Sequence, residues 1–96
     1  MTYELGFLDS ALKEWARLDG AIREQFKRKL AERLEYPRVA SACLSGQRDR
    51  YKIKLRNAGY RLVYEVRDAE LIILVIAVGR RDRSAVYEAA RTRRDG

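Results

Sequence analysis

The sequence predicts a compact α+β domain in which helices pack on a mainly antiparallel sheet of four strands. Three observations lead to this fold class. Apolar residues recur at helical spacing between residues 8 and 35, two segments between residues 50 and 67 alternate between apolar and polar residues, and residues 70–79 are almost continuously apolar. A chain of 96 residues can bury one modest core, so we expect a single domain spanning residues 1–96.

The N-terminal segment predicts a short strand followed by a helix. Residues 2–7 alternate weakly between apolar and polar types, which favours a strand. Asp9 or Ser10 can then cap a helix that runs to Leu18, because their side chains accept hydrogen bonds from the first amides of a helix. The apolar residues of this helix share one side, which should face the core.

A second, longer helix is expected over residues 21–35. Its apolar residues recur every four positions, and its outer surface interleaves basic residues with glutamates. Pro37 ends the helix, because the residue before a proline disfavours helical dihedral angles. Residues 38–49 should then form a loop.

Three further strands are expected at residues 50–56, 60–67 and 70–79. The last is apolar at nearly every position, which is typical of a central strand covered on both faces. The other two alternate, so that their apolar residues should face the helices. A short helix is predicted over residues 84–93. The two N-terminal helices should cover one sheet face and leave the other available.

Successive residues of a strand point to opposite faces, so four basic residues of the two alternating strands should lie together on that available face. We call them the cationic cluster. In YKIKLR, residues 51–56, every second residue is Lys or Arg, and the next strand adds one more arginine. Connecting loops of two or four residues would bring Arg61 across from Lys54 or Arg56. Like charges on adjacent sheet positions repel, so we expect a group outside the chain to compensate them. The cationic cluster consists of Lys52, Lys54, Arg56 and Arg61.

Composition restricts the chemistry. The net charge is +7, and residues 41–96 hold 13 Lys/Arg against 7 Asp/Glu, which favours an anionic partner facing the second half. The chain has no histidine, which excludes histidine-based acid–base catalysis and most zinc sites. Cys43 is the single cysteine, so no internal disulfide forms and a reducing cytoplasm fits. We expect no metal, no cofactor, no secretory signal and no membrane segment.

Two interpretations of the cationic cluster compete at this point. A solvated basic face that prevents edge-to-edge aggregation is common in sheet proteins. Arg80 and Arg81 leave the end of the central strand near the cluster, and Tyr87 can add a stacking surface beside it. Basic groups with an aromatic platform are typical of a single-stranded nucleic-acid site, and this interpretation leads.

RNA cleavage is permitted by the same residue types. Metal-free cleavage can use the 2′-OH of RNA as the nucleophile, provided that protein groups move protons and stabilise charge. A lysine crowded by other cations has a lowered pKa and can then act as a base. A module that only grips phosphates is the noncatalytic alternative. The candidates for cleavage are Lys52, Lys54, Arg61, Arg81 and Tyr87.

Four segments carry a resemblance to a known family: ALKEW (11–15), REQFKRKL (23–30), YKIKLRNAGYRLVYEV (51–66) and VGRRDRSAVY (78–87). They are similar to the RelE toxins of bacterial type II toxin–antitoxin systems, within the RelE/ParE superfamily, across nearly the whole chain. The resemblance implies a RelE-like fold and a ribosome-dependent mRNA endonuclease that cleaves A-site mRNA by 2′-OH attack and inhibits translation.

The resemblance also implies roles for the candidate residues. Lys52 and Lys54 would face phosphate, one of them as proton acceptor, and Arg61 would stabilise the transition-state charge. Arg81 would assist the leaving oxygen, while Tyr87 would stack on a base and orient the 2′-OH. Ser45 stands where some relatives have arginine, a departure that can weaken RNA contact. Further RNA or ribosomal-RNA contacts are expected from Arg56, Arg80, Arg83, Arg23, Lys27, Arg28 and Lys29.

The implied partners are a RelB-like antitoxin, the 70S ribosome with its mRNA, and operator DNA through the antitoxin complex only. One alternative is a ParE-like toxin that poisons gyrase by binding, although such relatives lack this catalytic set. The other alternative is the noncatalytic RNA- or ribosome-binding module.

Overall fold

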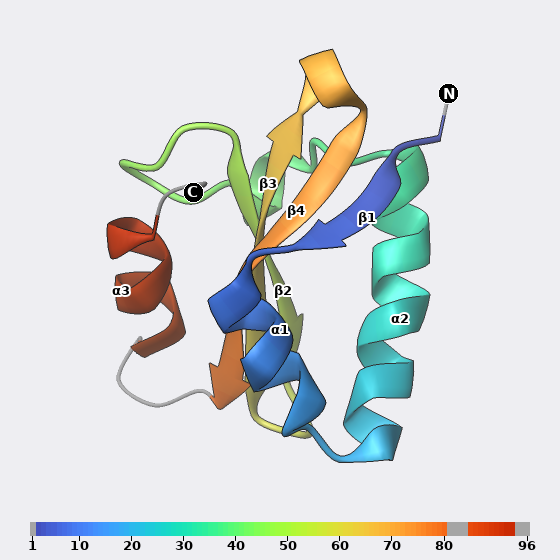
Figure 1. Cartoon of the computed structure of the whole chain (residues 1–96), viewed down its shortest axis with the longest axis vertical. Helices are drawn as coiled ribbons and strands as arrows, with labels where there is room; N and C mark the ends of the chain where they lie inside the picture. Colours follow the sequence, from blue (N-terminus) through green and yellow to red (C-terminus); the bar gives the residue numbers. More distant parts are fainter. Residues whose placement is uncertain (1, 81–84, 94–96) are drawn as a thin grey trace.

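A computed structural model describes residues 2–80 and 85–93, and it confirms the predicted α+β class (Figure 1). Four strands form one sheet in the order β1-β4-β3-β2. β1 runs parallel to β4, whereas the β3–β4 and β2–β3 pairs are antiparallel, so the sheet is mixed but mainly antiparallel. The strands are β1 (Glu4–Phe7), β2 (Arg50–Leu55), β3 (Tyr60–Arg67) and β4 (Ile72–Arg80).

The two N-terminal helices cover one face of the sheet. They are α1 (Asp9–Ala16) and α2 (Gly20–Glu35). Phe26 and Leu30 of α2 are fully buried against sheet residues such as Ile53, Leu62 and Tyr64. This core follows directly from the predicted alternation, because the apolar side chains of both strands point to the same side.

The N-terminal helices leave the opposite face available as expected, but this face is partly covered by a third helix. Helix α3 (Ala85–Thr92) lies on the far side of the sheet from α2 (Figure 1). Its buried Val86 and Ala90 pack with Val63 and Ile76 of the sheet in a second, smaller core. The reason is that β3 and β4 carry apolar residues on both faces at their centres. The apolar surface on the second face is therefore also buried away from solvent.

The helix starts differ from expectation in one case. Leu8 is the N-cap residue of α1, with no side-chain cap, so the prediction that Asp9 or Ser10 caps this helix is wrong. Asp9 instead lies in the first turn, where its negative charge favours the positive end of the helix dipole. Asp19 caps α2, and its carboxylate accepts a hydrogen bond from the Ala21 amide at 3.2 Å.

The loop between α2 and β2 and the β3–β4 connection each contain a short 3-10 helix, at Ala40–Ala42 and Asp68–Glu70. A β-bulge interrupts the β3–β4 pairing between Val63 and Tyr64. In the described part of the chain, no helix is both long and apolar enough to cross a bilayer.

Candidate nucleic-acid interface

The β2–β3 hairpin positions the cationic cluster. Leu55 pairs with Tyr60, which leaves a four-residue loop, and Lys54 lies directly opposite Arg61. Gly59 in this loop has φ +72°, a conformation that glycine adopts without steric cost. The sequence left Lys54 and Arg56 as alternatives for the residue opposite Arg61, and the observed register selects Lys54. Lys52 pairs with Val63, one step further along the same face.

Helix α3 brings Tyr87 onto Arg61. The guanidinium carbon of Arg61 lies 5.1 Å from the centroid of the Tyr87 ring, within the range of a cation–π contact. The Nε of Arg61 and the phenol oxygen of Tyr87 are buried, and neither has a hydrogen-bond partner among the described residues. Both groups therefore retain hydrogen-bonding capacity, one as a donor and the other as a donor and acceptor.

Burial controls the protonation of Tyr87. It raises the pKa of the phenol above its ordinary value, and the positive charge of Arg61 offsets part of this rise. Tyr87 is therefore neutral near pH 7. In this form its hydroxyl keeps a proton that it can donate, and its oxygen can accept a hydrogen bond.

Three neighbouring hollows meet at the cluster. The first, of about 160 Å³, is lined by Lys54, Leu55, Arg56, Tyr60 and Arg61. The second, of about 390 Å³, extends from Lys54 and Arg56 to Lys29 of α2. The third, of about 320 Å³, extends from the same two residues to Lys52, Arg33 and Ser41. Lys54 and Arg56 line all three, so a polyanion crossing this surface would meet basic groups throughout.

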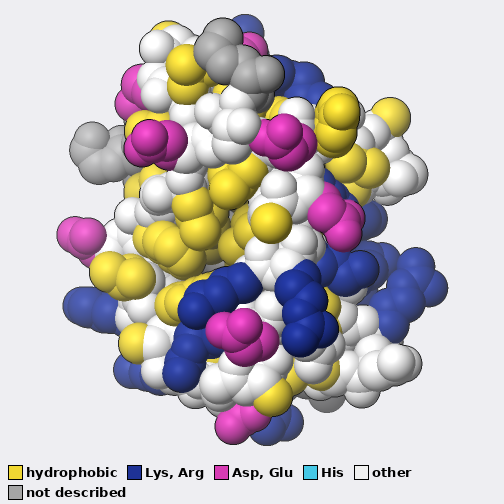
Figure 2. Space-filling view, turned by 90° about the vertical axis from the view of Figure 1, so that its right-hand side faces the viewer, with side chains coloured by type: hydrophobic (Ala, Val, Ile, Leu, Met, Phe, Trp, Pro, Cys, Tyr) yellow, Lys and Arg dark blue, Asp and Glu magenta, His cyan; other side chains and the backbone are white. Residues whose placement is uncertain are grey.

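Some basic side chains of α2 form contacts within the protein, and others are exposed to solvent. Figure 2 views the molecule from the α2 side and shows Lys and Arg side chains concentrated over its lower half. Arg23 donates hydrogen bonds to the backbone carbonyls of Ala16 and Leu18, at the end of α1. Lys27 forms an exposed ion pair with Glu24 at 3.2 Å. Arg28 and Lys29 are exposed, and of these two Lys29 lines a hollow shared with the cluster.

The remaining predicted residues lie at the end of β4 and beyond it. Arg80 is exposed, and its guanidinium stacks over the Tyr60 ring at 5.7 Å. Arg81 and Arg83 lie outside the described residues. Ser45 is exposed in the loop before β2 and is not among the residues that line the three hollows.

Two residues of this surface were not predicted. Arg33 of α2 donates to the Tyr64 hydroxyl at 2.8 Å and to the Lys52 carbonyl at 3.2 Å, which places it beside the cluster. Tyr60 was assigned to the core by parity, but it is half-buried and lines the first hollow. Strand parity gives no signal for Arg33, because the contact depends on how α2 packs against β2.

A mixed sheet with helices on both faces and a histidine-free cationic cluster defines a small, basic α+β protein. Residues 5–85 match the model of the ParE toxin family of type II toxin–antitoxin systems. The mRNA interferase toxin RelE of Escherichia coli K12 is 53% identical over 90 residues, which cover 94% of this chain and 95% of that protein.

Solved structures agree with this relationship. A double arginine-to-alanine mutant of E. coli RelE in the free state is 50% identical and superposes with a TM-score of 0.88, covering 95% of this chain and 96% of that one. RelE in the intact E. coli RelBE toxin–antitoxin complex is 52% identical, with a TM-score of 0.81 over 84% of this chain and 99% of that one. The chain belongs to the RelE family of type II toxins, within the RelE/ParE superfamily.

Proposed function

We propose that this chain is a single-domain, ribosome-dependent mRNA endonuclease that acts in the cytoplasm and inhibits translation. The observation that carries the proposal is the stacking of Arg61 on Tyr87 next to Lys54, in a chain 53% identical to an mRNA interferase toxin. The contact joins a permanent cation to a neutral phenol on one surface, and both retain hydrogen-bonding capacity.

The reaction is a transesterification within the RNA. The 2′-oxygen attacks the adjacent phosphorus and loses its proton to Lys52 or Lys54, and the bond to the 5′-oxygen breaks. The products are a 2′,3′-cyclic phosphate and a 5′-hydroxyl, whose proton is supplied with help from Arg81. Arg61 stabilises the additional negative charge on the phosphoryl oxygens in the transition state. Tyr87 stacks on a base and orients the 2′-OH through its hydroxyl.

The remaining basic residues bind RNA around the scissile phosphate. Lys29 and Arg56 line hollows that open from Lys54, and they can contact neighbouring phosphates of the message or ribosomal RNA. We assign Arg80, Arg83, Arg23, Lys27 and Arg28 to the same role. Of these, Arg23 also holds the end of α1, so its substitution should affect folding as well as binding.

A RelB-like antitoxin is the proposed inhibitor, and operator DNA is bound only through that complex. The support is that E. coli RelE forms a complex with its antitoxin. This chain also leaves apolar side chains exposed, including Leu5 on the edge strand β1 and Leu12 on α1. Exposed apolar surface of this kind is typical of protein interaction sites.

The test is toeprinting of a translated message with purified ribosomes and protein. Wild-type protein should produce cuts at A-site codons, and cleavage should fall at least about 100-fold in Arg61→Ala, since one charge-stabilising donor is lost. Arg48→Ala provides the matched control, because Arg48 is an exposed arginine in the loop before β2. Ribosome binding without cuts would support the noncatalytic module, and gyrase inhibition without cuts would support a ParE-like toxin.

A further inference from the structure

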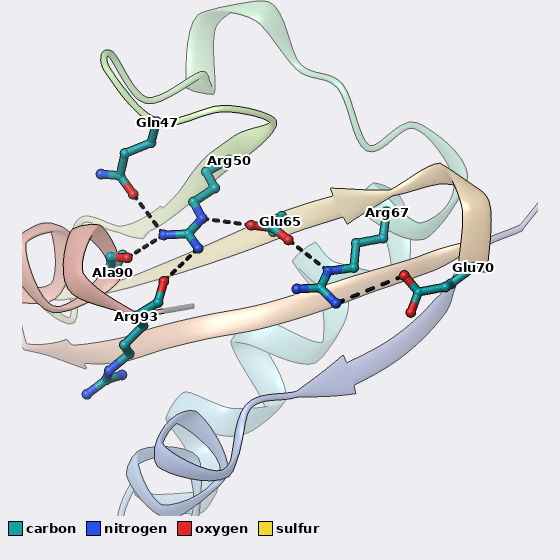
Figure 3. A network of polar contacts seen from close by, with 7 residues as sticks. All are labelled: Gln47, Arg50, Glu65, Arg67, Glu70, Ala90 and Arg93. Atoms are coloured by element: carbon teal, nitrogen blue, oxygen red, sulfur yellow. Dashed lines mark hydrogen bonds and ion pairs between the residues drawn. The ribbon is translucent and has the colours of Figure 1, made fainter. Parts of the chain in front are cut away.

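Arg50, the first residue of β2, is buried although it is charged, with 8% of its surface exposed. Its Nε donates to the Glu65 carboxylate at 3.0 Å, directly across the strand pair, and its Nη1 donates to the Gln47 side chain at 3.2 Å. A buried arginine is stable only when its charge and donors are satisfied, and Glu65 supplies the opposite charge. Figure 3 shows these contacts.

The other contacts of Arg50 lie at the end of α3. Its Nη1 donates to the Ala90 carbonyl, and its Nη2 donates to the Arg93 carbonyl at 2.8 Å (Figure 3). The last carbonyls of a helix have no partner within the helix and carry partial negative charge. Arg50 therefore caps the C-terminal end of α3 from the sheet and joins it to Glu65.

A second arginine attaches the same end of α3 to other elements. Both Nη atoms of Arg93 bond the Glu14 carboxylate of α1, at 2.8 and 2.9 Å, and Nη1 also donates to the Ile76 carbonyl at 2.9 Å. Glu14 in turn accepts a hydrogen bond from the Val78 amide at 3.1 Å. These contacts attach α3 to α1 and β4, whereas Arg50 attaches it to β2.

The register of β2 and β3 explains why this attachment concerns Tyr87. On the face covered by α3, the opposed pairs are Arg50 with Glu65, then Lys52 with Val63, then Lys54 with Arg61. Helix α3 spans this row: its C-terminal end contacts Arg50, and Tyr87 contacts Arg61. A helix of eight residues is too short to be stable alone, so its position depends on such contacts.

We propose that Arg50 is a positioning residue that holds the C-terminal helix so that Tyr87 stays stacked on Arg61. Arg50 touches no substrate in this scheme, and its effect on cleavage passes through the placement of Tyr87. The effect on cleavage rests on the proposed function, whereas the effect on the helix can be measured without it.

The first measurement is amide hydrogen exchange of the whole chain by NMR. In Arg50→Ala, the amides of α3 should exchange at least about tenfold faster, while those of β3 keep their wild-type rates. Arg67→Gln is the matched control: Arg67 bonds the same Glu65 carboxylate at 2.7 Å, from the side away from α3 (Figure 3). Arg50→Lys keeps a charge beside Glu65, should lie between wild type and alanine, and provides the comparison if Arg50→Ala does not fold.

The second measurement is single-turnover cleavage of ribosome-bound mRNA. Arg50→Ala should lower the cleavage rate at least about tenfold, leave the half-saturating ribosome concentration within about twofold, and be partly rescued in Arg50→Lys. Wild-type α3 exchange in Arg50→Ala would overturn the proposal, as would equal acceleration in α3 and β3 or an equal effect of Arg67→Gln. If wild-type protein cuts no mRNA, the proposed function fails, and the exchange data alone decide the role of Arg50.

Discussion

Replacement of Tyr87 by phenylalanine should separate cleavage from stability. The substitution removes one hydroxyl and keeps the ring that Arg61 contacts at 5.1 Å. The hydroxyl oxygen is buried and has no hydrogen-bond partner within the described residues, so its removal breaks no hydrogen bond there. The free energy of unfolding should therefore stay constant or rise by up to about 1 kcal/mol. For a domain of this size, a rise of about 1 kcal/mol in the free energy of unfolding raises Tm by at most about 4–8 °C.

Cleavage should respond in the opposite direction. If the Tyr87 hydroxyl orients the attacking 2′-OH, its loss removes a hydrogen bond made in the transition state, which typically lowers the rate about 100-fold. Toeprinting and single-turnover cleavage would measure this loss, and thermal unfolding would measure stability. Tyr36→Phe is the control, because the Tyr36 side chain is 80% exposed at the end of α2.

Alkaline unfolding gives a third measurement of the same variant. The pKa of Tyr87 is raised in the folded state by burial, so the folded chain holds this proton more tightly. The associated stability is present below the unfolded pKa of about 10 and is lost as pH rises through the folded value. Tyr87→Phe should lose less stability above pH 10 than wild type does. Wild-type cleavage in Tyr87→Phe, or a fall in Tm of more than about 4 °C, would refute the reasoning.

Three further outcomes are expected. Arg61→Lys should lower cleavage at least about tenfold, since lysine keeps the charge but not the planar donor fork, and wild-type rates would contradict this. Ribosome affinity should fall steeply between 50 and 300 mM salt in titrations, whereas a flat response would indicate a protein-only partner. Arg38 and Tyr3 hold the pKa of Asp68 below its usual value, so the associated stability is lost as pH falls through that lowered pKa. Asp68→Asn should flatten this acid dependence in urea unfolding, and an unchanged pH profile would exclude the contribution.

The sequence predicted the parts of the fold that depend on local periodicity. Alternation alone identified which side chains of β2 and β3 enter the main core, and the observed register places Lys54 opposite Arg61. Pro37 marked the end of α2, because a proline acts on its own backbone neighbours. Part of the site could be predicted for the same reason, since Lys52, Lys54 and Arg61 are alternate residues of these strands.

The position of Tyr87 beside the cluster was expected, but the other contacts of α3 could not be predicted in the same way. The run Leu62-Val63-Tyr64 is apolar at three successive positions, which indicates burial on both faces but not which element covers the second face. Alternation puts Arg50 on the same face as Lys52 and Lys54, but it gives no sign that Arg50 is buried against Glu65. Which arginine of a basic segment becomes internal depends on partners distant in the chain, and no local pattern encodes them.

The distribution of acidic residues explains how one sheet face can hold a helix and still bind an anion. β2 and β3 contain a single acidic residue, Glu65. Its two oxygens bind Arg50 at 3.0 Å and Arg67 at 2.7 Å, at the end of the row distant from the Lys54–Arg61 pair. Because this carboxylate is committed to arginines that hold structure, it does little to reduce the positive potential at the other end. The face is thus divided into a compensated end that fixes α3 and a cationic end beside Tyr87 that suits RNA phosphate.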